Sequence, residues 1–211
     1  MNKITGIKKK GSESNAVTLD DGSFFLLSPY QVLDLGLTEG DTADPAILGQ
    51  AAGEHEKTRA YEKALELLAS RDHARVELVR KLRKRGFGAE AIEDALGRLE
   101  SYGYIDDLRF AREFVLARLR RHPEGRAALA ARLSQRGVDR GVADEVLAEV
   151  LDEQTRARAL HEAADKLAAG GRRGDKLISA LLRRGFNGPA VRECVQDRYP
   201  DGEAREDGDS Q

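Results

Sequence analysis

Apolar residues recur along this chain with a long period. Three times a Leu is followed three residues later by Arg-Gly: Leu82/Arg85/Gly86, Leu133/Arg136/Gly137 and Leu181/Arg184/Gly185. Residues of aliphatic character share further positions relative to these glycines: Leu78, Leu129 and Leu177; Leu68, Leu119 and Leu167; Ile92, Ala143 and Val191; Leu96, Leu147 and Val195. A period of about fifty residues leaves room for three helices per unit. The pattern predicts a mainly α protein, built as an elongated array of three tandem three-helix repeats that bury matching stripes against one another.

The helices of each repeat follow from the apolar spacing and its breaks. In the first repeat we expect helices over residues 60–70, 75–85 and 90–102, the last ending at Gly103. Asp106 or Asp107 would cap the next helix. In the second repeat the first break falls at His122-Pro123, with Pro123 suited to a first helical turn. The Gly/Arg-rich residues 170–174 make the corresponding connection in the third repeat, which we expect to be the most mobile.

The N-terminal residues follow a different pattern. Short apolar runs at 4–7, 16–19 and 24–27, the last two separated by a turn sequence at 20–23, predict a small β-hairpin or three-stranded ribbon. Ser28-Pro29 favours a short helix over 29–35, and Asp44-Pro45 favours another that runs on into 54–70 or breaks near Gly53. A ribbon of this size is marginal alone, so it must pack on the repeats or act as an arm.

These elements define the expected organisation. The N-terminal ribbon with its short helix occupies residues 1–48, and the repeats occupy 49–106, 107–151 and 152–199. Residues 200–211 would form an acidic, disordered tail that could screen the basic repeats against stray DNA.

Charge is segregated along the chain. Residues 59–199 carry 29 Lys and Arg against 23 Asp and Glu, whereas residues 1–58 carry 5 against 9 and residues 200–211 carry 1 against 5. A basic body with acidic ends favours a polyanionic partner, either nucleic acid or an acidic protein face.

The candidate chemistry is sparse. The four histidines stand far apart, the single cysteine excludes an internal disulfide, and no phosphate-loop motif occurs. We therefore expect no catalytic residues, no metal and no cofactor. The absence of a secretory signal or a membrane-length apolar run, with one free cysteine, favours a cytoplasmic protein with no membrane partner. We also expect a monomer.

Several segments resemble a known family. The run Ala64–Leu78, followed by Lys81-Leu82 and Arg85-Gly86-Phe87, and the run Gly103–Asp107 leading into Phe110-Ala111, are together similar to the RecX family of RecA regulators. The resemblance covers about residues 59–198, and the N-terminal ribbon is similar to an extension carried by some longer members. Val138 departs from it, standing where the other two repeats have Phe87 and Phe186.

The resemblance implies a non-enzymatic protein that lies in the groove of the RecA–DNA filament. It would inhibit RecA ATP hydrolysis and strand exchange and limit filament growth, so modulating homologous recombination, DNA repair and the SOS response. Single- or double-stranded DNA would be bound weakly. A curved row of small units suits such a groove, because many weak contacts act together. The alternative is a sequence-independent DNA-binding protein that competes with the recombinase for DNA.

Basic side chains are the candidate binding residues. On the helix at 75–85, Leu78, Val79 and Leu82 define the buried face, which places Arg80 and Lys84 opposite it and Lys81 and Arg83 on the flanks. Five of the six residues at 80–85 are basic, and none is acidic to pair with them locally. Corresponding corners of the later repeats could form an uneven basic stripe. The candidate residues are Arg75, Arg80, Lys81, Arg83, Lys84, Arg85, Arg120, Arg121, Arg126, Arg132, Arg136, Arg172, Arg173, Lys176, Arg183 and Arg184.

Several of these residues also have a structural interpretation. Arg85, Arg136 and Arg184 each precede a helix-ending Gly, where a cation interacts favourably with the helix dipole. Arg75 and Arg126 fall at the edge of the core, where an acidic partner is expected, and His73 has a structural interpretation at a helix start. Three small or neutral residues, Ala128, Ala131 and Gln135, interrupt the stripe and could permit close approach to a protein surface.

The aromatic residues of the repeats argue against base reading as the main activity. Single-strand binders need exposed rings, whereas four phenylalanines fall at expected core positions: Phe87, Phe110, Phe114 and Phe186. Tyr102 and Tyr104 could anchor the packing of adjacent repeats.

Overall fold

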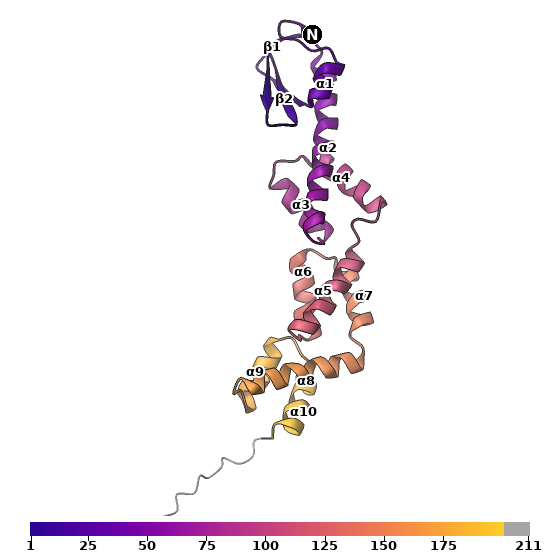
Figure 1. The fold of residues 1–211 in the computed structure, drawn as a ribbon. Helices are drawn as coiled ribbons and strands as arrows, with labels where there is room; N and C mark the ends of the chain where they lie inside the picture. The colour runs from indigo at the N-terminus through magenta and orange to yellow at the C-terminus, as the bar shows by residue number, and fades with distance from the viewer. Residues whose placement is uncertain (201–211) are drawn as a thin grey trace, which may run out of the picture. The chain divides into compact units, whose positions relative to one another are not determined.

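The computed structural model describes residues 1–200 and is mainly helical, with a small N-terminal sheet (Figure 1). It divides into two compact units, Met1–Ile105 and a second that begins at Asp106. The acidic tail expected over residues 200–211 lies, except for Pro200, outside the described residues.

The N-terminal sheet is antiparallel and has the strand order β3-β2-β1-β4. Its strands are β1 (Asn2–Lys10), β2 (Ser14–Leu19), β3 (Phe24–Leu27) and β4 (Thr42–Ala43), so the predicted ribbon is confirmed and β4 is an addition. Helix α1 (Pro29–Asp34) begins with the expected Ser28 cap, whose hydroxyl accepts a hydrogen bond from the Gln31 N–H. The strand β4 was missed because two residues are too few to show an alternating apolar pattern.

Helix α2 (Pro45–Ser70) joins the sheet to the first repeat without a break. Asp44 caps it as predicted, and its side chain accepts from the Ala46 N–H. The break considered near Gly53 does not occur, because helix propensity on both sides outweighs one glycine. Leu48 packs in the sheet's core and Ala64 in the first repeat's core. The expected boundary between residues 48 and 49 therefore falls inside one helix, and the ribbon packs on the helix instead of acting as a free arm.

The first repeat is completed by α3 (Arg75–Arg83) and α4 (Ala89–Ser101), close to their predicted limits. Its core consists of side chains that follow the repeat register, with Leu78, Leu82, Ile92 and Leu96 buried. Gly86, directly after α3, has a φ of +87°, which is the left-handed conformation that favours glycine at a helix end.

The second unit contains the other six described helices. They are α5 (Asp107–Arg121), α6 (Arg126–Arg136), α7 (Arg140–Val150), α8 (Glu153–Ala169), α9 (Gly174–Arg183) and α10 (Gly188–Arg198). Asp106 caps α5 through a hydrogen bond from the Arg109 N–H. Pro123 lies in the turn before α6, so its predicted place in a first helical turn is wrong; the helix begins three residues later, after Gly125. No helix in residues 1–200 is long and apolar enough to cross a membrane.

Candidate partner-binding surface

The outer face of α3 presents cations to solvent. Arg80, Arg83 and Lys84 are exposed, and their side chains form no hydrogen bond or ion pair with another described residue. Leu78 and Leu82 on the opposite face are fully buried, which fixes the rotation of the helix. We call Arg80, Arg83 and Lys84 the α3 basic face.

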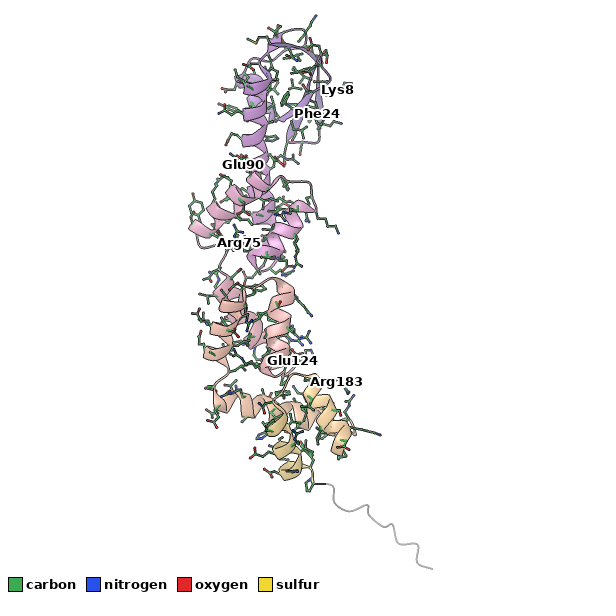
Figure 2. The ribbon with its side chains drawn as sticks, turned by 180° about the vertical axis from the view of Figure 1, so that it is seen from behind. Lys8, Phe24, Arg75, Glu90, Glu124 and Arg183 are labelled. Atoms are coloured by element: carbon green, nitrogen blue, oxygen red, sulfur yellow. The ribbon has the colours of Figure 1, made fainter. Side chains whose placement is uncertain are left out.

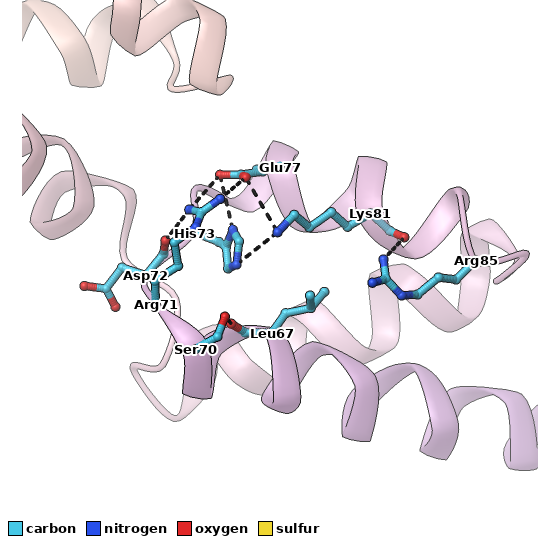
Figure 3. Close-up of polar contacts among 8 residues, drawn as sticks. All are labelled: Leu67, Ser70, Arg71, Asp72, His73, Glu77, Lys81 and Arg85. Atoms are coloured by element: carbon cyan, nitrogen blue, oxygen red, sulfur yellow. Dashed lines mark hydrogen bonds and ion pairs between the residues drawn. The ribbon is translucent and has the colours of Figure 1, made fainter.

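The prediction that Lys81 is exposed with its neighbours is wrong. It is half-buried, with its Nζ 3.8 Å from Glu77 Oε1 and 3.3 Å from His73 Nε2 (Figure 3). An acidic partner thus lies one turn earlier on the same helix, outside the stretch 80–85 in which none was expected. Lys81 holds the start of α3 in place and is not freely available to a partner.

Glu77 is the centre of this polar cluster. Its carboxylate accepts hydrogen bonds from Arg71 at 2.5 and 3.3 Å and lies 3.2 Å from His73 Nδ1 (Figure 3). Burial alone would raise the pKa of Glu77, but the contacts with Arg71 and His73 outweigh burial and lower the pKa to about 2. Burial lowers the pKa of His73 and so favours the neutral ring, in which an unprotonated Nε2 can accept a hydrogen bond from Lys81 Nζ. The structural interpretation of His73 fits this arrangement.

The second repeat has a comparable cluster around Glu124, which lies at the start of its middle helix (Figure 2). The buried carboxylate of Glu124 accepts from Arg118 Nη2 at 2.5 Å and from Arg132 Nε and Nη2 at 2.6 and 2.7 Å. These hydrogen bonds lower the pKa of Glu124, although burial alone would raise it. Arg132 therefore holds the loop before α6 through Glu124, and its role in binding stays a prediction.

Sequence reasoning missed this correspondence between the two clusters, although a signal was present. Counted back from Gly86 and Gly137, His73 and Glu124 occupy the same position, and Lys81 and Arg132 occupy another. The contact between these two positions is made in both repeats, with its chemistry changed from lysine–histidine to arginine–carboxylate.

Other candidate arginines are paired. Arg75 bonds Glu93 at 2.7 Å and Glu100 at 2.8 Å, and Arg126 bonds Asp144 at 2.8 Å, as expected for residues at the edge of the core. Arg75 is labelled in Figure 2. Ion pairs of this exposure contribute little to stability, but a partner must break them to use these arginines.

The arginines before helix-ending glycines also make local contacts. Arg85 Nη1 donates to the Lys81 carbonyl at 2.9 Å, and the Arg136 guanidinium lies 5.6 Å from the centre of the Phe114 ring. Arg173, at the start of α9, donates to the carbonyls of Ala168 and Arg172. These contacts are local and are compatible with the structural interpretation of Arg85 and Arg136.

The remaining candidate binding residues lie in the second unit, and their side chains are unpaired among residues 1–200. Their side chains form no hydrogen bond or ion pair with another residue that the structure describes: Arg120, Arg121, Arg172, Lys176, Arg183 and Arg184. Arg183 is labelled in Figure 2.

Two glycines bring the second and third repeats into contact inside this unit. The Gly125 N–H donates to the Arg184 carbonyl at 2.9 Å, and the Ala127 N–H donates to the Gly185 carbonyl at 3.4 Å. A Cβ added to Gly125 would collide with the Gly185 backbone, and a Cβ added to Gly185 would collide with the Ala128 backbone. Ala128 of α6 permits this close approach, and the approaching surface belongs to the same chain. The prediction that the small residues of α6 admit a partner surface stays a prediction.

Tyr102 and Tyr104 are exposed and face each other edge-on, with ring centroids 6.4 Å apart. Within the first unit both rings are exposed, and their role in packing between adjacent repeats stays a prediction. Phe110 is buried, while Phe87, Phe114 and Phe186 are half-buried. Among residues 1–200, no three His, Cys, Asp or Glu side chains converge into a site that could hold a metal ion.

Three-helix units in tandem with free cations on their outer faces define a helical-repeat protein. The family models agree: residues 60–99 match "RecX, first three-helix domain" and residues 106–147 match "RecX, second three-helix domain". The chain belongs to the RecX family.

Curated relatives support this membership, and solved structures share the fold. The chain is 38% identical over 159 residues to "Regulatory protein RecX" of Chlorobaculum tepidum, covering 73% of this chain and 97% of the relative. A second relative with that name, from Chlorobium phaeobacteroides, is 36% identical and covers 67% and 94%. A "Crystal structure of regulatory protein RecX" superposes with a TM-score of 0.66 at 21% identity, covering 93% of this chain and all of that one. RecX from Lactobacillus salivarius superposes with a TM-score of 0.60 at 22% identity, covering 67% and 96%.

Proposed function

We propose that the chain is a non-enzymatic regulator that binds the RecA filament on DNA, inhibits RecA ATP hydrolysis and strand exchange, and limits filament growth. It would act in the cytoplasm on recombination, repair and the SOS response. Family membership supports RecA as the partner, and the α3 basic face supplies an unpaired binding surface.

The composition of α3 favours a protein partner over bare phosphate. Val76 is 44% exposed and lies one turn before Arg80, with Arg83 a further turn along the same side of the helix. An exposed aliphatic residue in a row of cations gains from contact with a protein surface, whereas a phosphate backbone rewards the cations alone. This row is the observation that carries the proposal.

The test uses preformed RecA filaments on single-stranded DNA, near physiological salt, with co-sedimentation and RecA ATP hydrolysis as readouts. We expect the triple variant R80E/R83E/K84E to bind filaments at least about tenfold more weakly, because reversed charges would remove the attraction between this face and an acidic partner surface. Its inhibition of hydrolysis should fall in parallel.

A matched control reverses three exposed cations outside the candidate set, Arg158, Lys166 and Arg192, on α8 and α10. The R158E/K166E/R192E variant should retain filament binding. Equal losses in both variants, or equal retention of the native protein on filaments and bare DNA, would favour the DNA competitor. Full activity of the α3 variant would exclude this face as the docking surface.

A further inference from the structure

The N-terminal sheet has one face packed on α2 and a second, open face whose outer strands carry exposed side chains, while Ala16 on its central strand is buried. Ile7, Val17 and Phe25 are neighbours across β1, β2 and β3, and they belong to the apolar cluster that includes Leu48 of α2. A Cβ on Gly49 of α2 would lie 3.7 Å from the Phe25 ring. Because side chains alternate along a strand, the flanking residues point to the other face.

The open face combines an aromatic ring with lysines. Phe24 is 64% exposed, although its neighbour Phe25 is packed against α2. Lys8 and Lys10 belong to the same face as Phe24, because Lys8 is in register with Ala16 and Leu26, and Phe24 with Thr18 and Gly6. Figure 2 shows Lys8 and Phe24 on this sheet. The side chain of neither lysine forms a hydrogen bond or ion pair with another described residue.

The register sets the spacing between ring and cations. Lys8 and Phe24 are two strands and two residues apart, which at about 4.8 Å per strand and 3.4 Å per residue places their Cα atoms about 12 Å apart. A lysine side chain spans about half of that distance, so its ammonium can contact a phosphate next to a base stacked on the ring. Thr18 lies between them on the central strand.

We propose that this face binds a single strand of nucleic acid, with Phe24 stacking on a base and Lys8 and Lys10 contacting the backbone. A half-open antiparallel sheet with an exposed ring and unpaired cations is suited to unpaired bases, because every base offers a π-face. Two nearby acidic groups make contacts within the sheet: the Glu39 carboxylate accepts from the Ile7 N–H at 2.9 Å, and the Asp21 carboxylate accepts from Asn2 and Ser23.

A second copy of the chain is a poorer occupant. Face-to-face association of two copies would bring the same unpaired lysines together, and like charges across an interface oppose binding. The phenylalanines of the repeats, which argue against base stacking there, do not bear on this sheet. The sheet face is also separate from α3, so the proposal of nucleic-acid binding does not depend on the proposal of filament docking.

The experiment uses the full chain, a fluorescein-labelled dT 20-mer and a 20-base-pair duplex, with anisotropy as the readout. Replacing Phe24 by Ala should weaken binding of the single strand about tenfold, since a stacked ring contributes about 1–3 kcal/mol per base. The F24Y variant should keep near-native affinity, and duplex binding should barely change. The K8Q/K10Q variant should lower the slope of log affinity against log salt by about 1.4.

Two controls test whether the effect is specific to the open face of the sheet. Tyr30, which is 72% exposed on α1, is an aromatic residue outside this face, so Y30A should bind the single strand like the native chain. In the native chain, a dT 20-mer containing 5-iodouracil should crosslink to the peptide that contains Phe24. Equal losses for duplex and single strand, an unaffected F24A variant, or crosslinks confined to the repeats would overturn the proposal. A fall from dimer to monomer on F24A substitution, measured by light scattering, would assign the face to a second copy instead.

Discussion

The middle helices of the first two repeats share a core and differ on their outer faces. In α3, Leu78 and Leu82 are fully buried, and Leu129 and Leu133 occupy the same positions in α6 and are equally buried. The outer face of α3 carries unpaired cations, whereas the first turn of α6 is covered by Arg184 and Gly185 of the third repeat. The two helices therefore share the same buried leucine positions, but their exposed sides make different contacts.

This difference explains why position in the repeat does not predict function. Gly125 corresponds to Ala74 in the first repeat, counted from Gly137 and Gly86. Only a residue without Cβ permits the backbone contact that α6 makes, so the alanine leaves α3 unable to form the same contact. A helix that packs inside its own unit loses outer surface that α3 keeps available to a partner.

The largest effect should come from filling the glycine contact. Replacing Gly185 by Ala adds a left-handed strain of about 1–2 kcal/mol and an overpacking cost of about 1–3 kcal/mol against Ala128. We expect the free energy of unfolding of the second unit to fall by about 2–5 kcal/mol. Urea unfolding followed by circular dichroism measures the loss, and hydrogen exchange in α6 peptides locates it.

Gly86 provides the matched control, because it has the same register and a φ of +87° but no atom within 4 Å of an added Cβ. The G86A variant should lose only the strain of about 1–2 kcal/mol. If both variants were equally destabilised, the contact between Gly125 and Gly185 would contribute nothing to stability. Packing by the third repeat would then not distinguish α6 from α3.

Acid should weaken the polar cluster of the first repeat. The pKa of Glu77 is lowered to about 2, below its ordinary value of 4.5, so the unfolded chain binds the proton first as pH falls. The stabilisation is therefore complete above pH 4.5 and is lost between pH 4.5 and about 2. His73, with its lowered pKa, adds a loss of the same sign as pH falls through 6.5.

Urea midpoints at pH 7, 5 and 3 test this linkage. The E77Q variant should be less stable than the native chain at pH 7 by on the order of 2 kcal/mol, and the difference should shrink toward pH 3. A difference in stability that stayed constant with pH would mean that the charge of Glu77 does not stabilise the cluster.

The smallest effect distinguishes the tethered lysine from its free neighbours. Replacing Lys81 by Gln removes contacts to His73 and Glu77 and should cost about 0.5–1 kcal/mol, whereas R83Q should change stability by less than about 0.5 kcal/mol. Parallel melts of the two variants provide the measurement. Equal stabilities of the two variants would mean that the contacts of Lys81 do not stabilise the fold and that its side chain is as available to a partner as that of Arg83.

Much of the fold could be predicted because it depends on periodic burial. The leucine register, the Asp106 and Asp44 caps and the ribbon strands are local signals, and each agrees with the structure. The polar clusters could not be predicted in the same way, because Glu124 meets Arg118 and Arg132 only once the loop before α6 has folded back. Phe24 and Phe25 are adjacent in sequence, and only the packing of α2 decides which ring remains exposed.

Helix α2 has a consequence for how the first unit folds. Its 26 residues, about 39 Å of helix, supply Leu48 to the core of the sheet and Ala60 and Ala64 to the repeat. Because a helix propagates cooperatively, fraying at one end is resisted by packing at the other. The sheet and the first repeat should therefore melt as one cooperative unit, and a truncation between them would cut through shared structure instead of separating two independent domains.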